Sequence, residues 1–170
     1  GLGDGYKRQL HTHAAAAQAL LYPVSAELLA TTGRPVDLFG FEPNPARLGA
    51  AAAASASVPG IALTQLGALL DAAALGYNPA QAKPVVVLGH SQGVLAVHMV
   101  QAICEAGSID AAAAKIDEIL AIATLIGVAG TRQARQLGLA ARHGEATPML
   151  SVKDITRAQV DALIERVDGA

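Results

Sequence analysis

The chain has 170 residues, of which 52% are hydrophobic and only 3% aromatic, and its net charge is −2. This length suits one domain, with a core built from closely packed small side chains. Acidic and basic residues are scattered without a basic stripe, which argues against nucleic acid or an anionic membrane surface as a partner.

Apolar residues recur at helical spacing from about Tyr6 to Thr31, which predicts a helix there. Pro23 lies inside this pattern and predicts a kink or a break into two helices. The proline-containing segment 36–48 is expected to be irregular. The Ala/Ser-rich stretch that follows, up to Val58, is compatible with either a flexible link or a loosely specified helix.

A strong helix is predicted from Ile61 to Leu75, directly after Pro59-Gly60. Gly76 and Pro79 are expected to end it. Its large apolar side chains are expected to face inward: Ile61, Leu63, Leu66, Leu69 and Leu70.

The apolar run 84–88 predicts a buried strand, and the sequence Gly-His-Ser-Gln-Gly at 89–93 follows it directly. These five residues match the pattern G-x-S-x-G, in which a serine lies on a strained turn between a strand and a helix. Such a turn would expose Ser91 Oγ as a nucleophile. It would also aim the backbone N–H of Gln92 at a developing oxyanion.

The other residues of this turn are expected to support it. Glycine is expected to be required at positions 89 and 93, because a Cβ would clash where the strand and helix backbones pass close together. His90 is expected to pack or hydrogen-bond beneath the turn, since its side chain would point away from Ser91 Oγ. His98 is expected to face a neighbouring helix, and Cys104 to act as a small buried hydrophobe.

The helix after the turn is expected to end near Gly107, and Ser108 or Asp110 to cap the next one. That next helix runs to about Gly130 or on to Gln136, with an apolar stripe of Ile116, Ile119, Leu120, Ala123 and Ile126. Three charged residues are interpreted as its solvated face: Lys115, Asp117 and Glu118.

The final segment changes character. Residues 148–152 predict a short strand, and Thr156 with Gln159 fits a capping box that opens a helix through Val167. The chain therefore divides into a main unit, 1–146, and the beginning of a second unit, 147–170.

Three stretches resemble the acyltransferase domain of type I fatty acid synthases, most closely the acetyltransferase of fungal and bacterial multifunctional synthases. They are residues 58–66, residues 89–93, and residues 147–152 together with 156–160. The resemblance implies an α/β fold. Residues 1–146 would be an incomplete α/β-hydrolase-like large subdomain, a parallel sheet with flanking helices, and 147–170 the start of a ferredoxin-like small subdomain.

The resemblance also implies ping-pong acyl transfer. Ser91 would take an acetyl group from acetyl-CoA as an ester and pass it to the phosphopantetheine thiol of an acyl carrier protein. Coenzyme A and phosphopantetheine are thus expected as substrate carriers, with no covalently bound cofactor. The other domains of a large, homo-oligomeric synthase are expected partners. The family's histidine base and its second oxyanion donor have no counterpart in these residues, so little or no activity is expected from this chain alone.

Ile126 and Gln65 are expected to line the acyl pocket. Malonyl-loading relatives carry an arginine at the position aligned with Ile126, where it pairs with the free carboxylate. An isoleucine would leave that carboxylate without a partner, which favours acetyl over malonyl. Gln65, an amide among leucines, is equally compatible with a core-edge role in which it bonds a loop backbone.

Other readings of the same residues stay open. A serine hydrolase, such as a thioesterase or esterase, would use the same turn, and so would a malonyl- or palmitoyl-loading transferase. A third alternative is a structural part of a large assembly. No spacing of His, Asp or Glu suggests a metal site. With no signal peptide pattern, no long apolar span and a single cysteine, a cytoplasmic location away from the membrane is expected.

Overall fold

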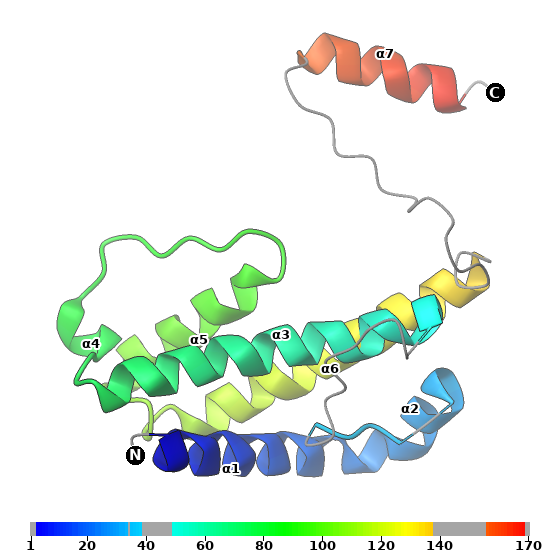
Figure 1. Ribbon diagram of the computed structural model, residues 1–170. Coiled ribbons are helices and arrows are strands. Elements are labelled where there is room, and N and C mark those ends of the chain that lie inside the picture. Colours follow the sequence, from blue (N-terminus) through cyan, green and yellow to red (C-terminus); the bar gives the residue numbers. More distant parts are fainter. Residues whose placement is uncertain (1–2, 34, 39–48, 138–155, 169–170) are drawn as a thin grey trace.

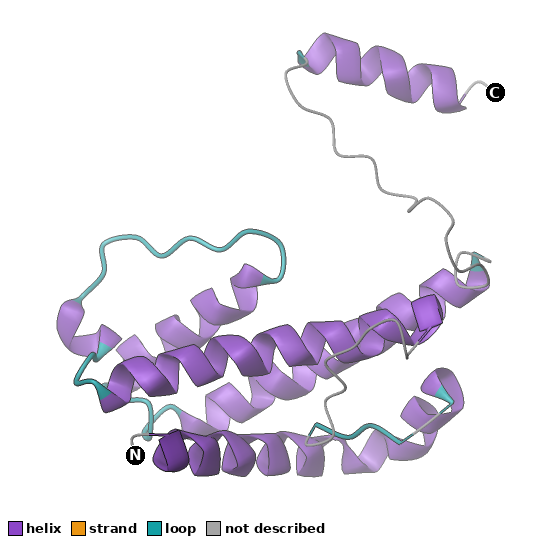
Figure 2. Ribbon diagram, in the orientation of Figure 1, coloured by secondary structure: helices purple, strands orange, loops and turns teal. Residues whose placement is uncertain are grey.

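The structure is a computed structural model that describes residues 3–33, 35–38, 49–137 and 156–168. These residues form helices joined by turns and loops (Figures 1 and 2). The elements in chain order are α1 (Gly3–Leu21), the 3₁₀ turn η1 (Tyr22–Val24), α2 (Ser25–Thr32), α3 (Gly49–Ala74), α4 (Pro79–Ala82), α5 (Gly93–Ala106), α6 (Ala113–Gln136) and α7 (Arg157–Asp168).

The predicted α/β fold is wrong: the described residues contain no strand, and so no parallel sheet or α/β-hydrolase-like subdomain (Figure 2). The run 84–88, predicted as a buried strand, is a loop in which Val85 is 98% and Leu88 89% exposed. A strand is stable only when neighbouring strands pair its N–H and C=O groups. The second predicted strand, 148–152, lies outside the described residues, as does the 146/147 boundary of the ferredoxin-like unit.

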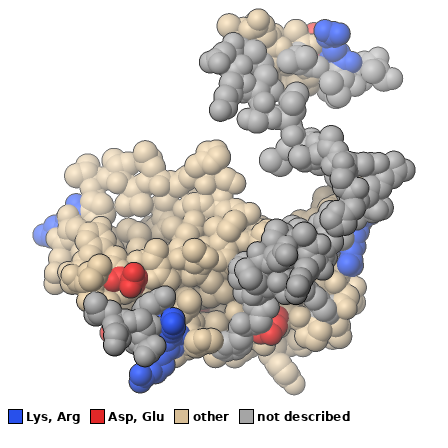
Figure 3. Space-filling model, in the orientation of Figure 1, with Lys and Arg blue, Asp and Glu red and all other residues tan. Residues whose placement is uncertain are grey.

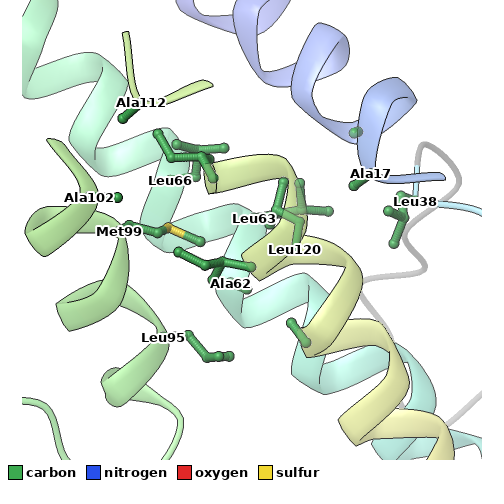
Figure 4. Close-up of a cluster of buried hydrophobic side chains, with 14 of the residues drawn as sticks. Ala17, Leu38, Ala62, Leu63, Leu66, Leu95, Met99, Ala102, Ala112 and Leu120 are labelled. Carbon is green, nitrogen blue, oxygen red and sulfur yellow. The ribbon is translucent and has the colours of Figure 1, made fainter. Parts of the chain in front are cut away.

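The core lies between the two long helices α3 and α6, with α1 and α5 packed on either side (Figures 1 and 4). The side chains at its centre are aliphatic, and alanines between them let the helix backbones approach closely. Its fully buried large apolar members are Leu66 and Leu70 of α3, Met99 and Ile103 of α5, and Ile116 and Leu120 of α6. This confirms the expected close packing of helices with small side chains, but the short sheet that they were expected to surround is absent from the described residues.

Helix α3 begins at Gly49, so the open question about the Ala/Ser stretch is settled as helix. The predicted start at Ile61 is wrong, because α3 continues through Pro59. A proline lacks the N–H of one helical hydrogen bond, but Val58 and Ala62 beside it are buried in the core, which offsets that loss. Ile61 is exposed instead of facing inward.

The part of α3 from Ser55 to Ala74 is long and apolar enough, by length and composition, to cross a membrane. It packs against α6 and α1 and buries Ala62, Leu66 and Leu70. A buried core helix passes the same test, so this property is weak evidence for a membrane span.

The predicted break at Pro23 is confirmed, since η1 separates α1 from α2 at that residue. Gly107, with φ of 89°, ends α5 in the left-handed conformation, as the sequence predicts. The predicted cap of α6 by Ser108 or Asp110 is wrong, because its N-cap residue is Ala112, which makes no side-chain cap hydrogen bond. Ser108 Oγ accepts a hydrogen bond from the N–H of Ala111 (3.1 Å) in the turn before α6.

The capping box of α7 is also confirmed. The N–H of Thr156 donates to Gln159 Oε1 over 2.8 Å, and the N–H of Gln159 donates to Thr156 Oγ1 over 3.4 Å. Two of the first N–H groups of α7 therefore find side-chain acceptors, which starts the helix at Arg157.

Candidate functional site

The turn that contains Ser91 lies at the end of a loop, 83–92, which arches from α4 to α5 (Figure 1). Helix α4 packs against α5, and Asn78 Nδ2 donates a hydrogen bond to the carbonyl of Gly107 (3.2 Å) at the far end of α5. The N–H of Ala80 donates to Asn78 Oδ1, so the same side chain also caps α4. The start of the loop is thereby anchored to α5, the helix that follows the loop.

Ser91 has a φ of 53°, in the left-handed region that side chains rarely adopt. Among the described non-glycine residues it shares a positive φ only with Lys83. Two backbone hydrogen bonds close the turn, from Gly93 N to His90 O (2.8 Å) and from Val94 N to Ser91 O (3.3 Å). The serine is exposed, so its hydroxyl stands outside the core on a sharp, strained turn.

Gly89 is required by close backbone contact. A Cβ there would lie 2.5 Å from the carbonyl carbon and oxygen of Gly93 and 2.7 Å from the N of Val94. The chain thus doubles back on itself across Ser91, and only glycine fits on the incoming side. At Gly93 the predicted clash is absent, because a Cβ would meet nothing within 4 Å.

Gln92 is the N-cap residue of α5. The carbonyl of Gln92 accepts a hydrogen bond from the N–H of Leu95 (3.1 Å). The N–H of Gln92 itself donates no hydrogen bond within the described residues. The N–H therefore lies at the positive end of the α5 dipole, next to Ser91, with its hydrogen-bonding capacity open. An anion that formed on a group bound to Ser91 could use it.

No side chain in the described part of the molecule is hydrogen-bonded to Ser91 Oγ. His90 and His98 are both exposed, and His98 lines a groove between α5 and the neighbouring helix α6, as the sequence predicts. The structure therefore identifies no general base among the described histidines. The expectation that His90 lies packed beneath the turn is wrong, because its side chain is solvent-exposed.

A groove of about 390 Å³ lies between α5 and α6 and begins just after this turn. Val94, three residues after Ser91, and Ile126 both line it. The structure thus brings the predicted acyl-pocket residue Ile126 to the same groove as the first turn of α5. Gln65, the other predicted pocket residue, lies on α3 and is not among the groove residues. Its Oε1 is buried without a hydrogen-bond partner, as is Oε1 of Gln92.

Sequence reasoning missed most residues of this groove, although a signal was present. Four of the six groove residues of α5 are spaced by four, three and four positions, and the four of α6 have the same spacing. Such spacing places side chains on one face of a helix, so it marks two facing stripes. The stripes are Val94, His98, Gln101 and Glu105 on α5, and Lys115, Ile119, Ile122 and Ile126 on α6.

Charge near the groove is confined to one end. The ammonium of Lys115 donates a hydrogen bond to Glu118 Oε2 (2.7 Å). The hydrogen bond and the charge of Glu118 raise the pKa of Lys115, with a further contribution from the charge of Glu105. Lys115 and Glu105 therefore lie at the same end, away from Val94, and Lys115 is cationic at neutral pH. Figure 3 shows how few charged side chains occupy the described surface of the face it presents.

A second cavity, of about 420 Å³, lies between α1 and α3. Its polar lining residues include His11, Thr64 and Asp71. It has no lining residue from the 83–92 loop, α5 or α6, so it is separate from the Ser91 turn.

Comparison with known protein families gives a match over most of the chain. The family model described as "Starter unit:ACP transacylase in aflatoxin biosynthesis" matches residues 48–169, well over half of the chain. The matched region contains α3, the 83–92 loop, α5, α6 and α7, whereas α1 and α2 precede it. Searches of curated proteins and of solved structures found no match.

Proposed function

The chain belongs to the family of starter unit:ACP transacylases, and within that family we propose that Ser91 is the residue that carries the acyl group. As the family's description states, its members transfer a starter unit to an acyl carrier protein. The activity of the family is therefore acyl transfer that primes a synthase, and its partner is the acyl carrier protein of a large multidomain enzyme.

The conformation of Ser91 is the observation that carries this proposal. Its φ of 53° holds the hydroxyl outward from a turn whose incoming side tolerates only glycine. A strained residue persists only where its surroundings impose it, and such residues cluster at functional sites. The open N–H of Gln92 supplies the second element, a donor directly beside the nucleophile.

These groups support a two-step transfer. Ser91 Oγ attacks the thioester carbonyl carbon and gives up its proton, which passes through solvent to the sulfur that leaves. The Gln92 N–H donates to the oxyanion, and the carbon–sulfur bond breaks to release coenzyme A as the thiol. The pantetheine thiol of the carrier protein then loses its proton and attacks the seryl ester, the ester carbon–oxygen bond breaks, and Ser91 Oγ takes up a proton to regenerate the hydroxyl.

We further propose that the acyl group is uncharged, with acetyl preferred over malonyl. Ile126 lies in the groove that begins at Val94, and the only charges of that groove stand at its opposite end. A malonyl carboxylate beside Ile126 would find no cationic partner there. Acetyl has no charge to satisfy.

The remaining features of the proposal rest on the sequence resemblance. Coenzyme A and phosphopantetheine act as substrate carriers, and no cofactor is held covalently. The synthase served is a cytoplasmic, homo-oligomeric fatty acid synthase of the multifunctional type. Malonyl- or palmitoyl-loading is the alternative within the transferases.

Intact-protein mass spectrometry tests the nucleophile. The purified chain is incubated with acetyl-CoA, with and without added imidazole as an external base, and the adduct is located by peptide mapping. We expect little or no ester without imidazole, because no described histidine supplies a base, and an acetyl ester on Ser91 when imidazole is present. This ester should be lost when pantetheine is added, with S-acetylpantetheine as the product.

The control is Ser91→Ala, which should form no adduct under either condition. Free acetate in place of S-acetylpantetheine would identify a serine hydrolase, for which the exposed position of Ser91 leaves water access. An ester on another residue, or no ester with imidazole present, would contradict the assignment of Ser91.

A further inference from the structure

The groove between α5 and α6 has one apolar end beside Ser91 and one charged end away from it. Val94, Ile122 and Ile126 line the first part, and Glu105 with Lys115 closes the second. We propose that this groove binds the alkyl part of the acyl group, that the chain passes Ile122, and that the charged end formed by Glu105 and Lys115 limits the length of chain that the protein accepts. The inference rests on the proposed role of Ser91 and adds the determinant of chain length.

The direction of the groove follows from the helices. Val94 opens α5 and Glu105 stands one residue before its end, while Lys115 lies near the start of α6 and Ile126 farther along. Only residues 107–112 connect the end of α5 to the start of α6, and the two helices are in contact, so they run antiparallel along the groove. A chain that starts on Ser91 therefore meets Val94 and Ile126 first, and the charged pair last.

The length of the groove sets an upper limit. Val94 and Ala102, the first and last uncharged residues that α5 contributes to the groove, are eight positions apart, which corresponds to about 12 Å at ~1.5 Å per residue. A saturated chain advances about 1.3 Å per carbon because its bonds are ~1.5 Å long and alternate in direction. About nine carbons beyond the carbonyl, an acyl chain of about ten carbons, thus fit before the charged end, with Ile119 and Ile122 on the α6 side and His98 and Gln101 on the α5 side. Longer chains reach Glu105 and Lys115.

Exposure of the lining residues shows that the groove is open to a ligand. Ile126 is 50% and Ile122 48% exposed, which is high for isoleucine on the inner stripe of two packed helices. Leu125 is similarly exposed, at 42%, but does not line the groove. It therefore provides a matched control on the same helix.

Binding can be measured without the chemical step. Acyl thioesters of N-acetylcysteamine, with two to twelve carbons, are titrated calorimetrically into the Ser91→Ala variant. We expect affinity to rise by roughly fourfold per methylene, since each buried methylene contributes a similar increment, and to stop rising at about ten carbons. Affinity independent of chain length would overturn the proposal.

Methyl NMR locates the ligand in the same samples. The δ1 methyl signals of Ile122 and Ile126 should shift with the ten-carbon thioester, whereas that of Ile61, exposed on α3, should not. The Ile122→Trp variant should lose the gain in affinity beyond about four carbons, and Leu125→Trp should keep it. Equal profiles for the two tryptophan variants would overturn the role of Ile122.

These outcomes separate the two proposals. Binding that depends on chain length, with no ester on Ser91, would support the groove as the binding site of the acyl chain and refute the role of Ser91 as nucleophile. If an ester forms on Ser91 at a rate that does not depend on chain length, Ser91 is the nucleophile but the groove does not bind the acyl chain.

Discussion

His13 Nδ1 lies 2.6 Å from Asp117 Oδ1 and so joins α1 to α6, although 104 positions separate the two residues. Both side chains are largely buried, with 9% and 14% exposed. Sequence reasoning placed Asp117 on a solvated face together with Lys115 and Glu118. That interpretation holds for the last two residues, which are exposed, and is wrong for Asp117.

Removing Asp117 should destabilise the bundle. In Asp117→Ala, the buried ring nitrogen of His13 loses its partner, and an unsatisfied buried polar group costs about 1–3 kcal/mol. We expect the free energy of unfolding, measured in urea, to fall by that amount. Glu118→Ala, which removes only an exposed pair with Lys115, should leave it within the error of measurement. Equal losses in the two variants would show that the His13 contact adds no stability.

The two glycines of the Ser91 turn should respond differently to alanine. Gly89→Ala places a methyl group 2.5 Å from backbone atoms of Gly93, and relief of such overpacking costs about 1–3 kcal/mol. Gly93→Ala meets nothing within 4 Å and should change stability by less than about 1 kcal/mol, toward greater stability. Thermal unfolding of both variants provides the measurement. A more stable Gly89→Ala variant would contradict the close approach of the two segments.

The strain at Ser91 predicts an unusual order of stabilities. Alanine at position 91 keeps the unfavourable φ of 53°, whereas glycine adopts it freely. Ser91→Gly should therefore be more stable than Ser91→Ala by about 1 kcal/mol, the reverse of the order expected in an ordinary helix. Urea unfolding of the two variants decides the matter, and a lower midpoint for Ser91→Gly would show that the turn is unstrained.

Ile126 should govern the choice between uncharged and carboxylated acyl groups. Ile126→Arg places a guanidinium in the groove beside Val94, where it can bind a malonyl carboxylate. Competition between malonyl-CoA and acetyl-CoA for Ser91, read by mass spectrometry, should shift toward malonyl by about tenfold or more. Leu125→Arg, outside the groove, is the control and should shift little. An unchanged ratio in Ile126→Arg would mean that this side chain does not meet the acyl group.

Local signals in the sequence predicted local structure well. Pro23, Gly107 and the pair Thr156 and Gln159 each mark a helix boundary that the structure contains. Each acts through its own backbone geometry or through neighbours within a few positions, so its effect can be read without the fold. Pro59 was misread for the opposite reason, because burial of Val58 and Ala62 by distant helices outweighs the local cost of a proline.

The apolar run 84–88 shows that a local pattern is not sufficient to predict a sheet. A row of β-branched residues favours an extended backbone but does not supply the neighbouring strands that a sheet requires. The described residues pack instead as helices around α3 and α6. The sheet was predicted from two short apolar runs and a family resemblance, whereas the fold of the described residues follows from long alanine-rich helices that bury their leucines and isoleucines against one another.

By itself, the order of residues determined where helices break and that a serine stands on a glycine-flanked turn, because these depend on neighbours along the chain. Only the tertiary structure decided that Asp117 pairs with His13, that Ile126 faces the α5–α6 groove, and that no strand forms in the described residues. Those outcomes depend on which helix faces meet. The free energy of packing between helix faces is a sum over side chains that are far apart in sequence, so no local pattern contains it.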